Sequence, residues 1–543
     1  MPNNSKSLPE SINNQLTQLA QDDRAIGIKS KFSKDSDRAT SFSYDHQDLF
    51  FDFSKTHISD ALVDVYLELA KQVDFEAKRL ALLAGDKINN SEDRSVLHPL
   101  LRDVSNQDIA MVEPEALSDA RQSKNEFLER YEKIQAELGK RSVAIKNIIH
   151  VGIGGSSLGT QLVFEALKDF GEGIEIHFVG NIDGHQLSDV LEKCRADNTL
   201  VIGVSKTFTT AETLQNLDSI AAWFKAQGVD KPLPNFYGVT ANPSRAVAYG
   251  IAVENTVSFP NWVGGRYSVW SSVSLSAALV VGIDRFGELL DGAANMDQHF
   301  YKTKLSENLP YLAASLDHYY TNFLDVKSRA IFAYDFRLRS LVDYLQQLET
   351  ESNGKDRQRD GEPVDQQTSP VVWGGVGTDV QHSVFQMLHQ GTSLIPSEFI
   401  LVKNADHQHA EHHQELLANG LAQPAALLAG QTYEQVCERH ASEHLSEPAK
   451  KAKIFSGDRP STSILLERLT PRALGGLLAF YEHRTFCFGV ITNINSYDQM
   501  GVELGKRLAK QVRPLLSTES QTQKSADELD SSTLNLLRRI TAD

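Results

Sequence analysis

The stretch TLVIGVSKTFTTAET, residues 199–213, decides the fold. Its first six residues form a short apolar run rich in β-branched side chains, which predicts a buried strand. Apolar side chains then recur at helical spacing up to Gly228, and TTAE (209–212) matches a capping box that predicts where this helix starts. A strand followed by a short polar loop and a helix is the repeating unit of a parallel sheet covered by helices.

Further apolar runs extend the alternation of strand and helix along the chain. Residues 1–110 are polar with amphipathic stretches, which predicts helices packed on the later part of the chain, and 517–532 reads as a solvated connector before a short terminal helix. Two cycles of alternation predict two α/β domains of similar plan. The strand candidates are 147–154, 174–182, 199–205 and 235–240 in the first cycle, and 329–334, 369–373 and 398–404 in the second.

Composition narrows the class of protein. A chain of 543 residues is too long for one ordinary core, and no run is long enough to span a membrane. The N-terminus has no signal-peptide pattern, and three cysteines are too few for a disulfide framework or a metal cluster, so we expect a reducing, cytoplasmic setting. The net charge of −17 argues against nucleic acid and anionic membranes as partners.

Hydroxyl side chains are concentrated at the predicted junction between the strand and the helix. Residues 204–213 hold five of them and one lysine, and the candidate site residues among these are Ser205, Lys206, Thr207 and Thr210. The free N–H groups and partial positive charge of a helix N-terminus suit a phosphate, and the hydroxyls and ammonium add donors. The alternative is that the threonines only cap the helix, but capping needs one or two hydroxyls.

A second loop of the same kind follows the strand candidate at 147–154. The segment GIGGSSLG (152–159) has glycines that allow close backbone approach, and it includes Gly155 and Ser156. A dinucleotide-binding fold is the alternative, with Asp183 as the ribose-binding acid. Its motif would need glycine where Ser157 stands, and the pairing with the hydroxyl-rich loop favours a phosphorylated small molecule.

Two further segments carry candidate catalytic groups. In LRSLVDYLQQLETESNGK (338–355) the leucines mark one helical face, Gln347 and Glu351 share another, and Asn353-Gly354 ends the helix. A helix C-terminus disfavours negative charge, which suits a carboxylate that must accept a proton, although an isolated glutamate is more often a solvated surface residue. Arg266 follows two glycines and is either a surface charge or a fixed cation for developing negative charge.

Other polar groups allow less specific interpretations. Gln499 and Lys506 are seven residues apart in a predicted helix, where a solvated Lys506 is the simpler interpretation. His382 and His389 are also seven apart, and either suits a structural histidine. The segment HQHAEHH (407–413) has no spacing typical of zinc, so we expect no metal site there.

Taken together, these stretches closely resemble the phosphoglucose isomerase family over nearly the whole chain. Six motifs in the family's order and spacing are far more specific than any one of them. This chain departs from the family's usual pattern at Asn261, at Met500 and in the loop 374–380. The motifs are GIGGSSLG (152–159), SKTFTT (205–210), WVGGRYS (262–268), ESNGK (351–355), QH followed by HQGT (381–392) and SYDQMGVELGK (496–506).

The resemblance implies two sugar-isomerase (SIS-type) α/β domains with parallel-rich sheets flanked by helices. It places a mostly helical segment at 1–115, the smaller lobe with the phosphate site at 116–290, the larger lobe at 291–515 and a tail at 516–543. It also implies a homodimer that interconverts glucose 6-phosphate and fructose 6-phosphate without a metal, nucleotide or other cofactor.

Roles carried over from the family's motifs fall into two groups. Glu351 would move a proton between C1 and C2, Arg266 would stabilise the cis-enediol(ate), and Lys506 and His382 would assist ring opening. The family supplies this histidine from the neighbouring subunit. The substrate-binding residues would be Ser205, Lys206, Thr207 and Thr210 for the phosphate, Gly155 and Ser156 along the sugar, and Gln347 and Gln499 as further contacts.

Two other classes share this kind of domain. An aminotransferase-type synthase would need a nucleophilic cysteine near the N-terminus, but the first cysteine here is Cys194. A non-catalytic sugar-phosphate sensor would lack the catalytic groups or carry a DNA-binding domain, and the acidic charge argues against the latter.

Overall fold

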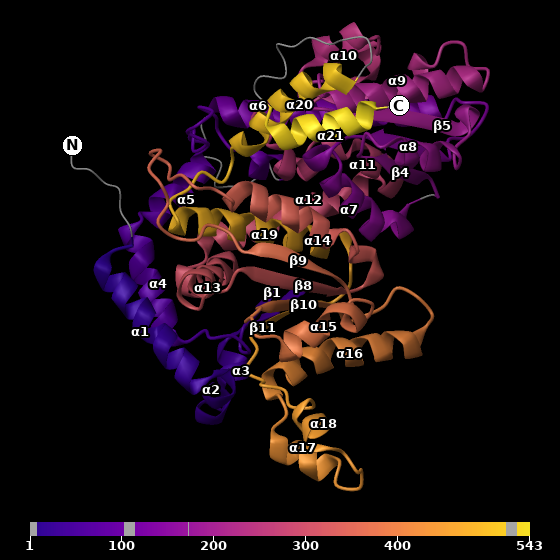
Figure 1. Ribbon diagram of the computed structural model, residues 1–543. Helices are drawn as coiled ribbons and strands as arrows, with labels where there is room; N and C mark the ends of the chain where they lie inside the picture. The colour runs from indigo at the N-terminus through magenta and orange to yellow at the C-terminus, as the bar shows by residue number, and fades with distance from the viewer. Residues whose placement is uncertain (1–7, 103–113, 172, 517–528, 543) are drawn as a thin grey trace. The chain divides into compact units, whose positions relative to one another are not determined.

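A computed structural model describes residues 8–102, 114–171, 173–516 and 529–542 (Figure 1). The chain forms two compact units, Met1–Ser496 and Tyr497–Asp543. The domain boundaries at 115, 290 and 515 stay predictions. None of the helices in the described ranges is both long enough and apolar enough to cross a bilayer.

The first unit contains a five-stranded sheet in which every neighbouring pair is parallel, in the order β4-β3-β5-β6-β7. All residues of β5 and β6 are buried, as expected for a parallel sheet covered on both faces. Four strands confirm the predicted first cycle, whereas the three-residue β7 was too short to be predicted. The strands are β3 (Asn147–Val151), β4 (Glu175–Val179), β5 (Thr199–Val204), β6 (Phe236–Thr240) and β7 (Thr256–Ser258).

Helices cover both faces of this sheet. Apolar side chains of α8, α9 and α10 pack against one face, while α7 and α11 pack together near the other, and α6 contacts β7. Gly228, with φ +86°, follows the end of α9, as predicted. The helices are α6 (Pro114–Leu138), α7 (Leu158–Leu167), α8 (Gly184–Leu191), α9 (Ala211–Ala226), α10 (Pro243–Tyr249) and α11 (Leu275–Val281).

A second sheet has the order β1-β2-β11-β10-β8-β9. Its four strands from the later part of the chain are parallel, and β2 joins β11 in antiparallel fashion. Three of these strands were predicted, but β11 was not, because its burial alternates and its apolar run is short. The strands are β8 (Ser328–Tyr334), β9 (Val371–Val376), β10 (Ser397–Val402) and β11 (Ser461–Leu466).

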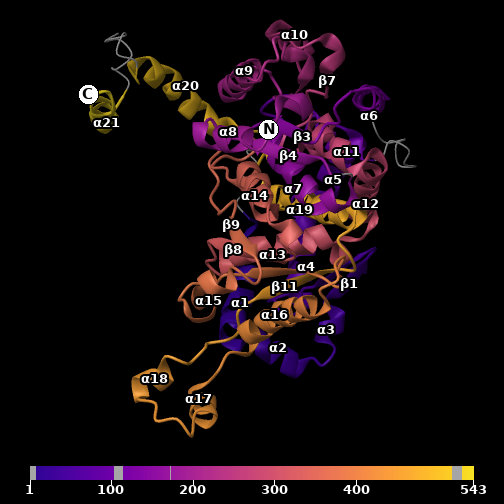
Figure 2. The ribbon, with the colours of Figure 1, turned by 90° about the vertical axis from the view of Figure 1, so that its right-hand side faces the viewer.

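Helices α7, α12, α14 and α19 lie between the two sheets in both views (Figures 1 and 2). Every residue of helix α19 except Arg472 is buried, and this helix packs mainly against α12 and α13. Helices α15 and α16 pack on the outer face of the second sheet, and α17 and α18 follow them. The helices are α12 (Ile283–Lys302), α13 (Leu309–Phe323), α14 (Leu341–Gln346), α15 (Gln381–Gln390), α16 (Ala410–Ala429), α17 (Tyr433–Arg439), α18 (Glu447–Lys451) and α19 (Pro471–Ile491).

The N-terminal segment is helical, as predicted, but it also contributes a hairpin to the second sheet. Strands β1 (Ser43–His46) and β2 (Leu49–Asp52) pair with each other, and β2 extends the sheet beside β11. The segment SYDHQDLFFD is too short, and its first half too polar, to predict a strand. The helices are α1 (Glu10–Ile26), α2 (Ile28–Lys34), α3 (Arg38–Ser41), α4 (Asp60–Gln72) and α5 (Phe75–Ala84).

The second unit contains α20 (Glu503–Val512) and α21 (Ser531–Thr541). Helix α21 confirms the predicted terminal helix, and most of the predicted connector lies outside the described residues. Gln499 precedes a 3₁₀ turn, Met500–Val502, with φ −154°. The prediction that Gln499 and Lys506 share one helix is therefore wrong, because α20 begins at Glu503 and the backbone at Gln499 is not helical.

Strand order determines where loops from distant parts of the chain meet. In the first sheet β3 and β5 are neighbours, while the chain continues from β3 outward to β4 and from β5 outward to β6. The carboxyl ends of β3 and β5 therefore flank a crevice of the kind that binds ligands in open α/β sheets. The glycine loop follows β3 and the hydroxyl-rich loop follows β5, so both predicted substrate loops lie at this switch point.

Candidate active site

The hydroxyl-rich loop runs from the end of β5 to the first turn of α9. Ser205 Oγ lies 3.0 Å from Thr210 Oγ1, and Thr207 Oγ1 lies 2.7 Å from Thr209 Oγ1. The hydroxyls therefore pair across the loop at the positive end of a sixteen-residue helix. The N-cap residue is Thr210, one residue after the Thr209 that the capping box predicted, and its side chain makes no capping bond in this described segment. The capping-box prediction is wrong, because Thr209 pairs with Thr207 and Thr210 pairs with Ser205 instead.

Phe208 stabilises the backbone conformation of the same loop. Its φ of +51° lies in the left-handed region, which is unusual for a residue with a large side chain. The ring is 2% exposed in the core under α9, and the Phe208 N–H donates to Ser205 Oγ at 3.2 Å. Burial of the ring and closure of the turn therefore offset the backbone strain.

The glycine loop contacts the loop that carries Arg266. A Cβ on Gly155 would lie 2.2 Å from the carbonyl carbon of Gly265, so the two backbones touch where only glycine fits. Ser268 Oγ donates to the Gly155 carbonyl at 2.9 Å. Next to it, His150 Nε2 lies 2.7 Å from the Ser156 carbonyl oxygen. These contacts bring Gly155 and Ser156 to Arg266, which lies more than a hundred residues further along the chain.

Gln347 and Glu351 begin and end a single π-helical turn that continues α14. Helical residues run on to Asn353, which confirms the predicted helix end at Asn353-Gly354. A Cβ on Gly154 would lie 3.0 Å from Gln347 Nε2, so this turn reaches the glycine loop. The wider π turn was not predicted from the leucine spacing, and such turns are frequent at functional sites.

Arg266 and Glu351 face each other at the centre of the site. Arg266 Nη1 lies 3.7 Å from Glu351 Oε1, and the Arg266 side chain is 1% exposed. The alternative that Arg266 is a surface charge is therefore wrong. Glu351 Oε2 is buried and has no hydrogen-bond partner among the residues that the structure describes. A carboxylate with one oxygen near a fixed cation and the other unpaired has the arrangement of a general base.

Lys206 links the hydroxyl-rich loop to the Arg266 loop. Its Nζ donates to the Val263 carbonyl at 3.0 Å. Burial lowers the pKa of Lys206 to about 8, with a smaller lowering from Arg94 and an opposing effect of Glu92. A dianion beside the ammonium would favour its charged form, so the group is suited to respond to a phosphate.

One predicted site residue of the first unit, His382, is not brought into this cluster. His382 lies in the first turn of α15, is exposed, and forms no side-chain hydrogen bond within the described ranges. Its helix neighbour His389 lies 3.3 Å from Gln423 Oε1, in agreement with a structural histidine. Gln499 and Lys506 belong to the second unit, where Lys506 Nζ donates to Glu503 Oε1 at 2.9 Å.

Sequence reasoning overlooked residues that support the site from behind. Lys355 Nζ donates to the carbonyls of Glu351 at 2.7 Å and Ser352 at 2.9 Å, and so satisfies the end of this helix. A lysine four residues after Glu351 was the signal for this contact. Nothing in the local sequence distinguished His150, because its partners Ser156 and Ser276 become neighbours only in the fold.

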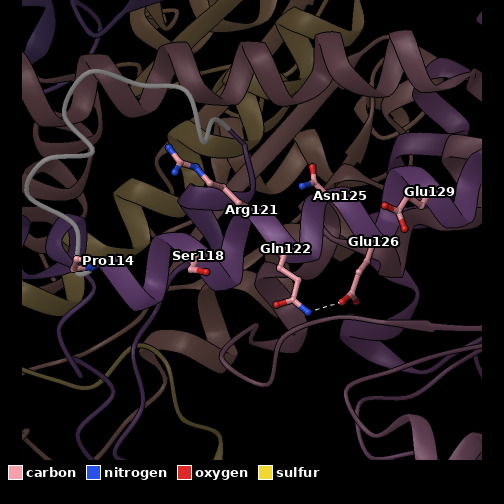
Figure 3. A pocket seen from close by; sticks show the side chains of 7 residues that line it. All are labelled: Pro114, Ser118, Arg121, Gln122, Asn125, Glu126 and Glu129. Carbon is pink, nitrogen blue, oxygen red and sulfur yellow. Dashed lines mark hydrogen bonds between the residues drawn. The ribbon is translucent and has the colours of Figure 1, made fainter.

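Two other features are separate from this cluster. A surface pocket of about 410 Å³ follows α6 and contains none of the predicted site residues (Figure 3). Asp183, the ribose-binding acid of the dinucleotide alternative, instead caps α8 by accepting from His185 N. The described part of the chain has no group of three or more His, Cys, Asp and Glu side chains placed to hold a metal ion. The pocket is lined by Pro114, Ser118, Arg121, Gln122, Asn125, Glu126 and Glu129.

The glycine loop, the Arg266 loop and the Glu351 turn that meet here all lie within one long family match. A family model described as phosphoglucose isomerase matches residues 52–537. The chain belongs to the phosphoglucose isomerase family. The match covers the whole first sheet, the second sheet from the last residue of β2 onward, and most of the second unit.

Individual relatives agree with this family over nearly their full length. The chain is 43% identical to a glucose-6-phosphate isomerase of Rhizorhabdus wittichii, over 95% of this chain and 97% of the relative. It is 42% identical to a glucose-6-phosphate isomerase of Chlorobium luteolum, over 96% of each. A crystal structure of a glucose-6-phosphate isomerase from Chlamydia trachomatis superposes with a TM-score of 0.84 at 30% identity, over 98% of this chain and all of the other.

Proposed function

We propose that this chain interconverts glucose 6-phosphate and fructose 6-phosphate in glycolysis and gluconeogenesis, as an aldose–ketose isomerase. The observation that carries this proposal is the pairing of the half-buried Glu351 with the buried Arg266, with Glu351 Oε2 unpartnered among the described residues. Membership in the family favours this reaction over the synthase and sensor classes. The direct test is to incubate the purified protein with fructose 6-phosphate and follow glucose 6-phosphate by NMR. A rate equal to the protein-free control would reject the proposal.

The proposed chemistry is a proton transfer through a cis-enediol(ate). Glu351 removes the proton from one of the two reacting carbons and returns it to the other, which interconverts aldose and ketose without a redox partner. Negative charge then develops on an oxygen, and Arg266 is buried and fixed nearby to stabilise it. Gln347 lies between the base and the glycine loop, where Gly155 and Ser156 would line the sugar.

The phosphate would occupy the hydroxyl-rich loop, far enough from Glu351 to orient the substrate without taking part in the chemistry. Ser205, Lys206, Thr207 and Thr210 supply hydroxyl donors, one ammonium and a helix N-terminus. Phosphate binding at a remote point holds the reacting carbons in place. Ring opening would fall to Lys506 and His382, with Gln499 as a further contact.

Replacing Lys206 by alanine is expected to weaken fructose 6-phosphate binding by roughly 10- to 100-fold, since a partly buried ammonium would no longer meet the dianion. The pKa of about 8 gives this prediction a pH signature. Below pH 8 the ammonium is charged and binding is strong; above it the proton is lost and the wild-type KM rises. Lys206→Ala should lack this rise.

The control for Lys206 is Lys225→Ala, which removes an exposed cation from the other end of α9. KM values from pH 6.5 to 9.5, at low and high salt, make the comparison. Unchanged affinity in Lys206→Ala would show that the phosphate binds elsewhere.

We also propose a cytoplasmic homodimer in which His382 of one chain completes the site of the other. The exposure of His382 in the single chain supports this arrangement, because an acid–base group placed at a surface needs a partner to enclose it. No nucleic acid or membrane takes part in this proposal.

Co-refolding Glu351→Gln with His382→Ala should restore activity that neither variant has alone. In a mixed dimer one site carries both lesions and the other carries neither. Random mixing puts about half of the dimers in this state, each with one intact site, so about a quarter of wild-type activity should return. Differently tagged chains identify the mixed dimers. If mixed dimers form but activity stays at the average of the two variants, His382 acts within its own chain or not at all.

A further inference from the structure

Ser352 is the residue immediately after Glu351, and it is fully buried. Its hydroxyl accepts from Arg266 Nε at 2.6 Å and lies 2.9 Å from the Tyr267 hydroxyl. We propose that Ser352 is a positioning residue that holds the Arg266 guanidinium in the orientation needed to stabilise the enediolate. This inference rests on the roles proposed above for Glu351 and Arg266.

The hydrogen bonds of Arg266 point in different directions. Nε donates to Ser352, and Nη2 donates to the Ser496 carbonyl at 2.7 Å, while Nη1 faces Glu351 at 3.7 Å. A guanidinium is planar, so two anchors on different nitrogens determine how its plane lies. The anchors hold Nη1 beyond hydrogen-bond distance of Glu351, so the carboxylate is not drawn into a tight ion pair that would hinder proton acceptance.

Both anchors are themselves held by the core. Ser496 Oγ donates to Asn353 Oδ1 at 2.7 Å, and Asn353 Nδ2 donates to the Thr485 carbonyl in α19 at 3.0 Å. The Tyr267 ring stacks on His98 with centroids 4.7 Å apart. Ser352 therefore joins the turn that carries the base to the loop that carries the cation, with rigid elements behind each.

Without the Ser352 hydroxyl, Arg266 Nε would lose this acceptor in a buried site, and the guanidinium would turn toward Glu351. Misplacement of a catalytic group by about 1 Å can cost up to ~10²-fold in rate. We therefore expect Ser352→Ala to lower kcat by roughly 10- to 100-fold. The KM for fructose 6-phosphate should stay within about twofold, because the phosphate loop is untouched.

The test measures kcat and KM for the wild type, Ser352→Ala, Arg266→Lys and the double variant. Ser352 acts through Arg266, so adding Ser352→Ala to the Arg266→Lys variant should lower kcat by less than about twofold further. Ser315→Ala is the matched control, since Ser315 is a buried serine whose hydroxyl donates to the Tyr311 carbonyl at 2.8 Å in α13. It should lose no activity.

The possible results of this test distinguish a failure of the inference about Ser352 from a failure of the proposed function. A wild-type kcat in Ser352→Ala, or an equal loss in both backgrounds, overturns the role of Ser352. A wild type without isomerase activity instead rejects the proposed function, and an Arg266→Lys variant with full activity rejects the role proposed for Arg266. If Ser352→Ala does not fold, Ser352→Cys replaces it, because a thiol has nearly the same size and is a weak acceptor. Full kcat in the cysteine variant overturns the inference equally.

Discussion

Glu351→Gln is expected to slow isomerisation by at least ~10²-fold while fructose 6-phosphate still binds. Glutamine has the size of glutamate but cannot accept the proton. The buried Oε2 of Glu351 has no partner in the described ranges, so the substitution breaks no hydrogen bond there. The phosphate loop is a separate element, so affinity should survive the loss of chemistry.

The measurements for Glu351 are initial rates and a dissociation constant from calorimetry. Glu362→Gln serves as the control, because this carboxylate lies further along the same chain segment and is exposed. It should behave as wild type. Turnover by Glu351→Gln near the wild-type rate would assign the proton transfer to another group.

The second large effect concerns stability. Arg329→Leu is expected to lower the free energy of unfolding by about 3–5 kcal/mol, because it leaves buried carboxylates without the cation that pairs with them. Arg329 reaches Asp317 at 2.6 Å, Glu349 at 2.5 Å and Glu398 at 3.0 Å. Burial raises the pKa of Glu349 even with Arg329 beside it. Arg484, which bonds Asp317 and Glu398, compensates only in part.

Urea unfolding followed by circular dichroism measures this loss. The matched control is Arg285→Leu, which removes an exposed ion pair with Glu288 and should cost about 0–1 kcal/mol. Equal stability losses in the two variants would show that the buried network contributes no more than a surface pair. Since Glu349 lies in the π turn that ends at Glu351, the network also supports the catalytic turn.

Much of the fold could be predicted from the sequence, because strands buried on both faces read as uninterrupted apolar runs. This holds for β3, β5, β8 and β10. Strands β1, β2, β7 and β11 were not predicted, because their runs are short or largely polar, and β2 and β11 are recognisable only through their pairing with each other across the sheet.

The candidate site was harder to predict, because its residues meet only through tertiary contacts. Local spacing pointed to the hydroxyl-rich loop as the candidate phosphate site and placed Gln347 with Glu351, which the structure shows in one π-helical turn. It left open whether Arg266 was buried, and it gave no sign of Ser352. For Arg266, Lys506 and His382 the family resemblance supplied roles that spacing alone did not favour. The capping-box prediction failed for a related reason, since the Thr209 hydroxyl pairs with Thr207 across the loop.

The close approach of Gly155 and Gly265 limits how this protein can evolve. Any side chain at 155 would put a carbon atom 2.2 Å from the backbone of the neighbouring loop, so that loop would have to retreat. Arg266 directly follows Gly265 in that loop and would move with it. A methyl group added at position 155 would therefore displace Arg266 by moving the main chain of its loop. Position 155 should tolerate almost no substitution, whereas exposed positions on α6 and α16 should tolerate many.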